Sequence, residues 1–160
     1  MPEMSLTQII IYDYREEFHA KLFRVWLIIK LYGLNRNKRK TLTLDKLHLF
    51  DFFLCNEKYI KLFISPSDGY EYNDDLLYNS NVSYGEHHIL KPTISAISVL
   101  KDSGFIEIEK IDNAFYCYCT ERILVENEEL IKPWLNKLKL LKPLLNKSTS
   151  NINKKLLEVQ

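Results

Sequence analysis

The spacing of apolar residues changes from helical to alternating at Gly104, and this change constrains the fold more than any other feature of the sequence. Residues 89–104 place apolar side chains at helical spacing, with Pro92 in the first turn, where proline is tolerated, and Gly104 at the end. Residues 105–111 alternate between apolar and polar side chains, and residues 114–120 alternate again after a short polar turn. The sequence therefore predicts a helix that is followed directly by a β-hairpin.

Three helices are predicted ahead of this motif. Residues 15–32 carry apolar side chains on one helix face, and Gly33 is expected to end that helix. Thr43 is the expected N-cap of residues 44–56, which are apolar on nearly every side and should therefore be buried from several directions. Residues 57–65 continue as a short third helix.

The order of these elements predicts an α+β fold, mostly α, with a winged helix-turn-helix core, N-terminal helices and a C-terminal amphipathic helix. A chain of 160 residues suits a single domain. We expect that domain to span residues 1–147, followed by a basic flexible tail, 148–160. Its parts are a helical region at 1–65 that starts with a short strand or an extended arm, a polar loop at 66–88, the third helix and wing at 89–122, and the C-terminal helix at 127–147. The third helix should bury a stripe of Ile94, Ile97 and Leu100.

The expected location is the cytoplasm, without a membrane span. No apolar run approaches the roughly 20 residues that cross a bilayer, and no export signal is recognisable at the N-terminus. Three cysteines are an odd number, which is typical of reduced thiols in the cytosol.

The charge distribution argues against DNA reading by the third helix. Residues 66–129 carry 13 acidic and 4 basic side chains, whereas both flanking parts of the chain are basic. Lys91 and Lys101 stand at the ends of the helix, and the positions expected to be exposed between them are uncharged: Thr93, Ser95, Ala96 and Ser98. Affinity for nucleic acid depends on cations that face the phosphates. Contact with a protein is therefore the favoured role, and a winged-helix DNA-binding transcriptional regulator is the alternative.

Two sets of residues are candidates for binding. The candidate partner-binding residues are aromatic and apolar side chains of the hairpin and the C-terminal helix: Tyr116, Tyr118, Trp134, Leu138 and Leu141. The candidate nucleic-acid contacts are cations of a basic loop and of the C-terminal helix: Arg36, Lys38, Arg39, Lys40, Lys137 and Lys142. A solvated loop and a solvated helix face are the simpler interpretation of these cations.

Catalysis, a cofactor and a metal are not expected. The sequence contains no glycine-rich phosphate loop, no H-E-x-x-H and no C-x-x-C motif. Cys117 and Cys119 share one strand face and could form a metal site with His87 and His88, but this spacing is weak evidence. We interpret the two cysteines as structural residues that pack under the wing.

Residues 12–145 resemble a known family of defence proteins. The stretches "REEFHAKLFRVWLIIKLYG", "TLTLDKLHLFDFFLCNEKYIKLF" and "ISAISVLKDSGFIEIE" resemble the small middle component of ABC-three-component systems, which include Lamassu-type antiphage systems. The resemblance implies a non-catalytic winged-helix adaptor that links an SMC-like ABC ATPase to an effector, often a nuclease. Such an assembly would sense foreign or broken DNA, and DNA would be contacted within the complex. An antitoxin-like inhibitor is a further alternative.

Overall fold

The fold is mostly helical, with one small sheet. A computed structural model describes residues 6–64, 90–124 and 128–159. Its elements are α1 (Leu6–Tyr32), α2 (Leu44–Cys55), α3 (Glu57–Ile64), α5 (Lys91–Asp102), β1 (Ile106–Ile111), β2 (Ala114–Cys119), α6 (Glu128–Leu141), the 3-10 helix η2 (Lys142–Asn146) and α7 (Thr149–Val159). Within the described residues these six α-helices and one antiparallel hairpin confirm the predicted α+β class. None of the described helices is both long enough and apolar enough to cross a bilayer.

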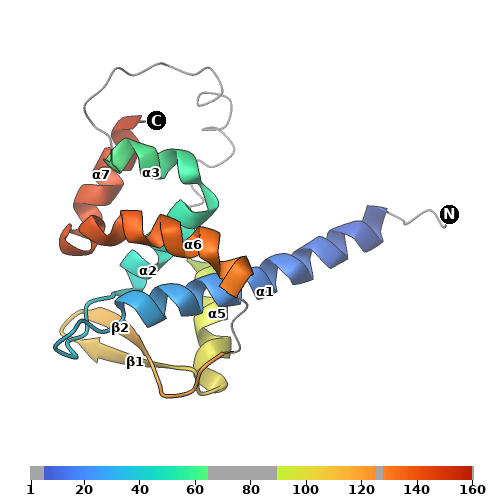
Figure 1. The fold of residues 1–160 in the computed structure, drawn as a ribbon, viewed down its shortest axis with the longest axis horizontal. Helices are drawn as coiled ribbons and strands as arrows, with labels where there is room; N and C mark the ends of the chain where they lie inside the picture. Colours follow the sequence, from blue (N-terminus) through green and yellow to red (C-terminus); the bar gives the residue numbers. More distant parts are fainter. Residues whose placement is uncertain (1–5, 65–89, 125–127, 160) are drawn as a thin grey trace.

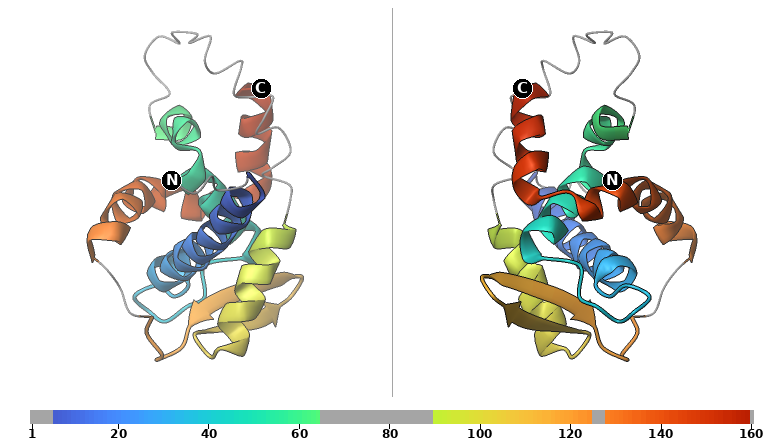
Figure 2. Two further views of the ribbon diagram at one scale, coloured as in Figure 1. Left: turned by 90° about the vertical axis from the view of Figure 1, so that its right-hand side faces the viewer. Right: turned by 90° about the vertical axis from the view of Figure 1, so that its left-hand side faces the viewer.

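Helix α1 passes through the middle of the structure and separates two layers. Helices α2 and α6 lie on one side of its C-terminal half, and α5 with the hairpin lies on the other (Figure 1). The two side views show α5 packed against the hairpin and α7 beyond α2 (Figure 2). The first turns of α1 extend away from these layers (Figure 1).

Helix α2 supplies the centre of the core. Nine consecutive residues, Lys46 to Leu54, are buried, which confirms that this apolar helix is enclosed from several sides. Phe50 is fully buried and meets the edge of the Tyr32 ring, with 5.7 Å between the ring centroids. Trp26 of α1 and Tyr59 of α3 are also buried, so all three N-terminal helices share one core.

Thr43 caps α2 as the sequence predicts. Its hydroxyl accepts a hydrogen bond from the backbone N–H of Lys46 over 3.3 Å. Replacing Thr43 by alanine should lower the free energy of unfolding by about 1 kcal/mol, because this N–H then loses its partner. Urea denaturation followed by circular dichroism would measure the change. Thr43→Ser keeps the oxygen and is the matched control, so an equal loss in both variants would contradict the capping explanation.

The hairpin follows α5 as predicted. Gly104 ends the helix with a φ of 79°, a conformation that glycine adopts without strain. Strands β1 and β2 then pair in register, with Ile106 opposite Cys119 and Ile111 opposite Ala114. At the turn Asp112 has a φ of 54°, in the left-handed region that Asp tolerates.

The buried face of α5 differs from the predicted one. Ile97 and Leu100 are buried as expected, but Ile94 is 46% exposed, whereas Thr93 and Ala96 are fully buried. The Thr93 hydroxyl lies 2.8 Å from Nδ1 of His48, so a hydrogen bond satisfies this polar group inside the core. The prediction that Thr93 and Ala96 are exposed was wrong, because the helix turns its small residues toward α1 and α2.

Both ends of the chain are more helical than expected. Helix α1 begins at Leu6, where a strand or an extended arm was predicted. The C-terminal helix is divided, since α6 ends at Leu141 and Pro143 lies in the 3-10 turn that follows. Helix α7 then replaces the predicted flexible tail, and its Ile152 and Leu156 are buried. The predicted polar loop at 66–88 lies outside the described residues.

Candidate functional site

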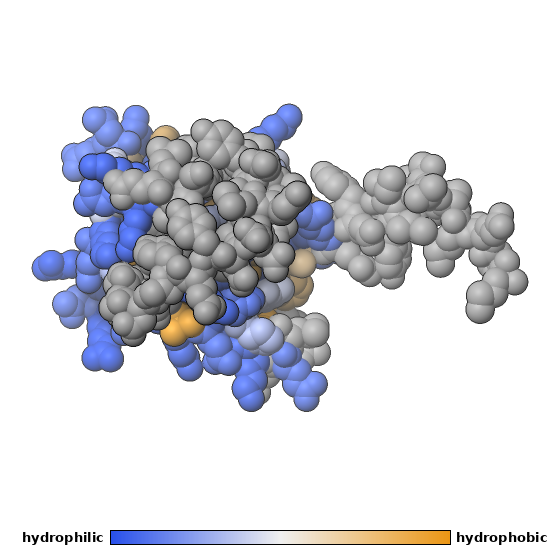
Figure 3. All heavy atoms as spheres, turned by 90° about the horizontal axis from the view of Figure 1, so that it is seen from above, coloured by the Kyte–Doolittle hydropathy of each residue, from blue (hydrophilic) through white to orange (hydrophobic). Residues whose placement is uncertain are grey.

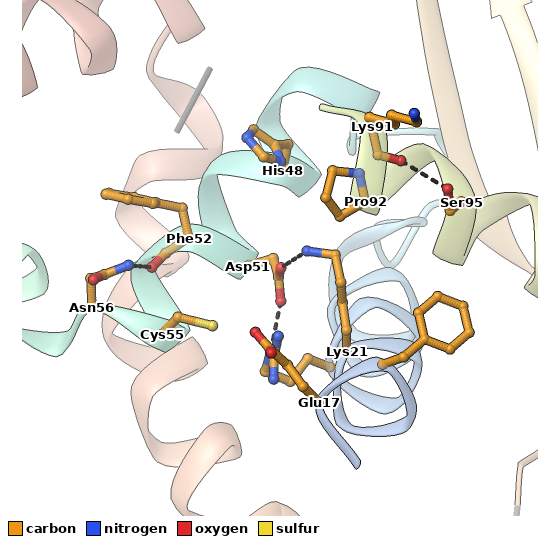
Figure 4. A pocket seen from close by; sticks show the side chains of 12 residues that line it. Glu17, Lys21, His48, Asp51, Phe52, Cys55, Asn56, Lys91, Pro92 and Ser95 are labelled. Carbon is orange, nitrogen blue, oxygen red and sulfur yellow. Dashed lines mark hydrogen bonds and ion pairs between the residues drawn. The ribbon is translucent and has the colours of Figure 1, made fainter. Parts of the chain in front are cut away.

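A polar cavity of about 550 Å³ opens between α1, α2 and α5 (Figure 4). Charged side chains line it from α1 and α2, and Lys91, Pro92 and Ser95 of α5 close the opposite side. The lining residues with ionisable or hydrogen-bonding side chains are Glu17, Lys21, Arg24, His48, Asp51, Cys55, Asn56, Lys91 and Ser95. A cavity with this composition is the first place to look for chemistry.

Asp51 is the buried centre of this cavity. One carboxylate oxygen lies 2.6 Å from Nζ of Lys21, and the other lies 2.8 Å from Nε of Arg24. Burial disfavours the Arg24 cation, but the Asp51 carboxylate outweighs this effect, and the pKa of Arg24 is raised. Two cations of α1 therefore share one carboxylate of α2. The network attaches α1 to α2.

Two further polar groups of the cavity have defined surroundings. His48 is buried and hydrogen-bonded to Thr93, which places its ring between α2 and α5. Desolvation raises the pKa of the Cys55 thiol, so this sulfur stays protonated near neutral pH and is a poor nucleophile. His48 thus connects α2 to α5, as Asp51 connects α2 to α1.

The two hairpin cysteines are also protonated thiols. Burial raises the pKa of Cys117 and of Cys119 to about 11. Within the part of the chain that the structure describes, no group of three or more His, Cys, Asp or Glu side chains is placed to hold a metal ion. His87 and His88, the other candidate ligands, lie outside the described residues.

The candidate partner-binding residues are divided between core and surface. Leu138 and Leu141 of α6 are fully buried in the chain's own core, so they offer no surface to a partner in this structure. Tyr116, Tyr118 and Trp134 are half-buried. Cations cover two of these rings, since Lys40 lies over Tyr118 at 4.9 Å and Arg24 over Trp134 at 5.9 Å. A partner-binding role for these three aromatic residues stays a prediction.

Three of the six candidate nucleic-acid contacts line one groove. Arg36 and Lys40 from the loop after α1 and Lys142 from η2 surround a groove of about 740 Å³. Lys38 and Arg39 are exposed on the same loop but do not line it. Lys137 lies 3.5 Å from Glu57 of α3 instead. Hydrophilic side chains also dominate the described surface seen from above (Figure 3).

Sequence patterns did not point to two further cations that line this groove. Lys46 of α2 and Lys139 of α6 join the other three in its wall. Lys46 is buried, together with His48 and Asp51, inside a helix that is otherwise apolar. Polar residues in such a helix are a usable signal, because each of them needs a partner when it is buried. No comparable signal marks Lys139.

The described surface thus offers a cavity with a buried ion-pair network, an exposed face of α5 beside the hairpin, and a basic groove. The cavity and the groove share no lining residue. Relatives cannot assign a role to any of them, since the sequence matches no protein-family model and no curated protein, and the fold matches no solved structure.

Proposed function

We propose that this chain is a non-catalytic adaptor that links an SMC-like ABC ATPase to an effector in a bacterial antiphage complex that senses foreign or broken DNA. The proposal joins the resemblance to the middle component of ABC-three-component systems with the surface chemistry of α5. It interprets α5 and the β1–β2 hairpin as the third helix and the wing of a winged helix. In the proposed role, α5 and the hairpin bind a partner protein of the complex and not DNA.

The exposed face of α5 carries the proposal. Ile94 and Val99 are 46% and 41% exposed on it. The hydroxyls between them turn back to the helix, since Ser95 donates to the Lys91 carbonyl over 3.0 Å and Ser98 donates to the Ile94 carbonyl over 2.9 Å. Between Lys91 and Lys101, the exposed side of α5 therefore carries apolar side chains, two serines and no cation. Such a face suits an apolar protein contact better than a phosphate backbone.

The hairpin beside α5 supports the same interpretation. Ile111 and Phe115 are exposed near its turn. Glu107 and Asp112 are exposed acidic residues on the hairpin, against which Lys110 is the exposed cation. A duplex would meet little positive charge here, whereas a protein could cover the exposed apolar side chains.

An adaptor role asks of Asp51 only that it join α1 to α2, and its ion pairs with Lys21 and Arg24 do this. The ATPase and the effector would supply the chemistry of the complex.

Copurification from the native host tests the proposal. The tagged wild-type chain should bring down an SMC-like ABC ATPase, and a double variant, Ile94→Asp with Val99→Asp, should lose it. Leu140→Asp is the matched control, because Leu140 is 50% exposed on α6, away from α5, and should retain the ATPase. All three substitutions lie on the surface and should leave the circular dichroism spectrum unchanged.

Two results would contradict the adaptor role. A wild-type chain that brings down no ATPase would remove the proposed partner. Tight, salt-sensitive binding of a specific duplex that the Ile94→Asp and Val99→Asp substitutions abolish would instead favour the transcriptional regulator.

A further inference from the structure

A basic groove lies between the loop after α1 and the end of α6, well separated along the chain from α5. Its wall carries five cations and no Asp or Glu. They are contributed by the loop, α2, α6 and η2: Arg36, Lys40, Lys46, Lys139 and Lys142. Only Lys40 among them pairs with a described carboxylate, that of Glu109 on β1. The groove therefore keeps a strong excess of positive charge.

The loop that forms one wall is held in a fixed shape. The side-chain oxygen of Asn35 accepts hydrogen bonds from the backbone N–H groups of Asn37 and Arg39, each over 2.9 Å. The backbone of Leu34 pairs with that of Lys40, and Thr41 donates from its N–H to the Gly33 carbonyl over 3.1 Å. The loop backbone therefore loses little freedom when the loop binds a ligand.

Lys46 is a second feature of the groove that an anion would satisfy. Its side chain lines the groove, although the residue is only 9% exposed. Nζ donates to the Leu145 carbonyl over 2.5 Å, and Lys46 forms no salt bridge with any described residue. A cation that is buried without a negative partner is costly. An anion in the groove would supply that partner.

We propose that this groove binds the phosphodiester backbone of a nucleic acid. Protein interfaces are depleted of lysine, whereas four of the five cations here are lysines. The groove also presents the amide of Asn146 and the half-buried ring of Tyr116. An amide N–H can donate to a phosphate oxygen, and a tyrosine ring can pack against a sugar or a base.

The groove and the exposed face of α5 are separate surfaces. Its lining residues include none from α5. From the hairpin, Tyr116 is the one described residue that lines the groove. Nucleic acid in the groove would therefore leave the exposed face of α5 uncovered. The proposal depends on the groove alone and stands or falls independently of the adaptor role.

Fluorescence anisotropy with labelled single-stranded DNA, duplex DNA and single-stranded RNA tests the proposal on the full chain. A double variant, Lys139→Glu with Lys142→Glu, should weaken binding by about tenfold or more at low salt. The slope of log affinity against log salt concentration should fall by about two, because each lysine neutralises about one phosphate. Both lysines are exposed, so the fold should be retained.

The control is Lys132→Glu with Lys155→Glu, which makes the same change in net charge at positions outside the groove. This control should keep most of the wild-type affinity. Comparison of the three probes would show whether a single strand or a duplex fits best. The proposal fails if no probe binds at low salt, if the control loses as much affinity as the groove variant, or if polyglutamate binds as tightly as the nucleic acids.

Discussion

Replacing Asp51 by alanine is expected to lower the free energy of unfolding by about 3–5 kcal/mol. The carboxylate is almost completely buried and is the shared partner of Lys21 and Arg24, at 2.6 Å and 2.8 Å. Its removal leaves two largely buried cations of α1 without the α2 carboxylate that they share. The loss should be visible as a lower urea midpoint with an unchanged slope.

Two controls separate the charge effect from simple truncation. Asp102→Ala removes an exposed carboxylate at the end of α5 and should change stability by no more than about 0.5 kcal/mol. A triple variant that replaces Asp51 by leucine and both Lys21 and Arg24 by methionine should recover much of the lost stability, because no buried charge then remains. If Asp51→Ala were no more damaging than Asp102→Ala, the network would not attach α1 to α2.

Replacing Gly33 by alanine should lower the free energy of unfolding by about 3 kcal/mol. A Cβ atom at this position would lie 2.8 Å from the Cys117 carbonyl oxygen and 2.9 Å from Cα of Tyr118. It would also lie 2.6 Å from the carbonyl oxygen of Ile29. These are backbone atoms, which cannot move aside as a flexible side chain can. The end of α1 would therefore be pushed away from β2.

Gly104→Ala is the informative comparison for this variant. Gly104 has a φ of 79° but has room for a methyl group, since the nearest atom is a side-chain nitrogen of Arg122 at 3.7 Å. Its replacement should cost only about 1 kcal/mol of backbone strain. Thermal or urea unfolding of both variants would rank them. A smaller loss for Gly33→Ala than for Gly104→Ala would mean that α1 and β2 separate without a large penalty.

Local sequence patterns predicted the hairpin and most of the helices, though not α7, because the causes of these elements are local. The cap at Thr43, the stop at Gly33 and the alternation after Gly104 each depend on a few neighbouring residues. The pattern identified Gly33 only as a helix end. Its second role, the close approach to β2, depends on residues far along the chain and leaves no mark in its own neighbourhood.

Side-chain burial was harder to predict where a distant partner decides it. Thr93 is in the core because His48 of another helix lies within hydrogen-bond distance. Leu138 and Leu141 are in the core because α6 packs on α2 and α3. The apolar stripe of this helix, which suggested a docking face for a partner, is therefore the face that the helix turns to its own core. The convergence of Arg36 and Lys142 in one groove likewise depends on tertiary packing.

The backbone edge just before α2 is paired with β2. The N–H of Cys117 donates to the Leu42 carbonyl over 3.1 Å, and Thr43 forms a bridge with Tyr116. During synthesis this edge leaves the ribosome long before β2 has been made. Until then its hydrogen-bonding groups stay hydrated or pair with other segments. The first helices of a nascent chain should consequently stay loosely ordered until the hairpin emerges, and polypeptides that stop before it should be especially prone to aggregate.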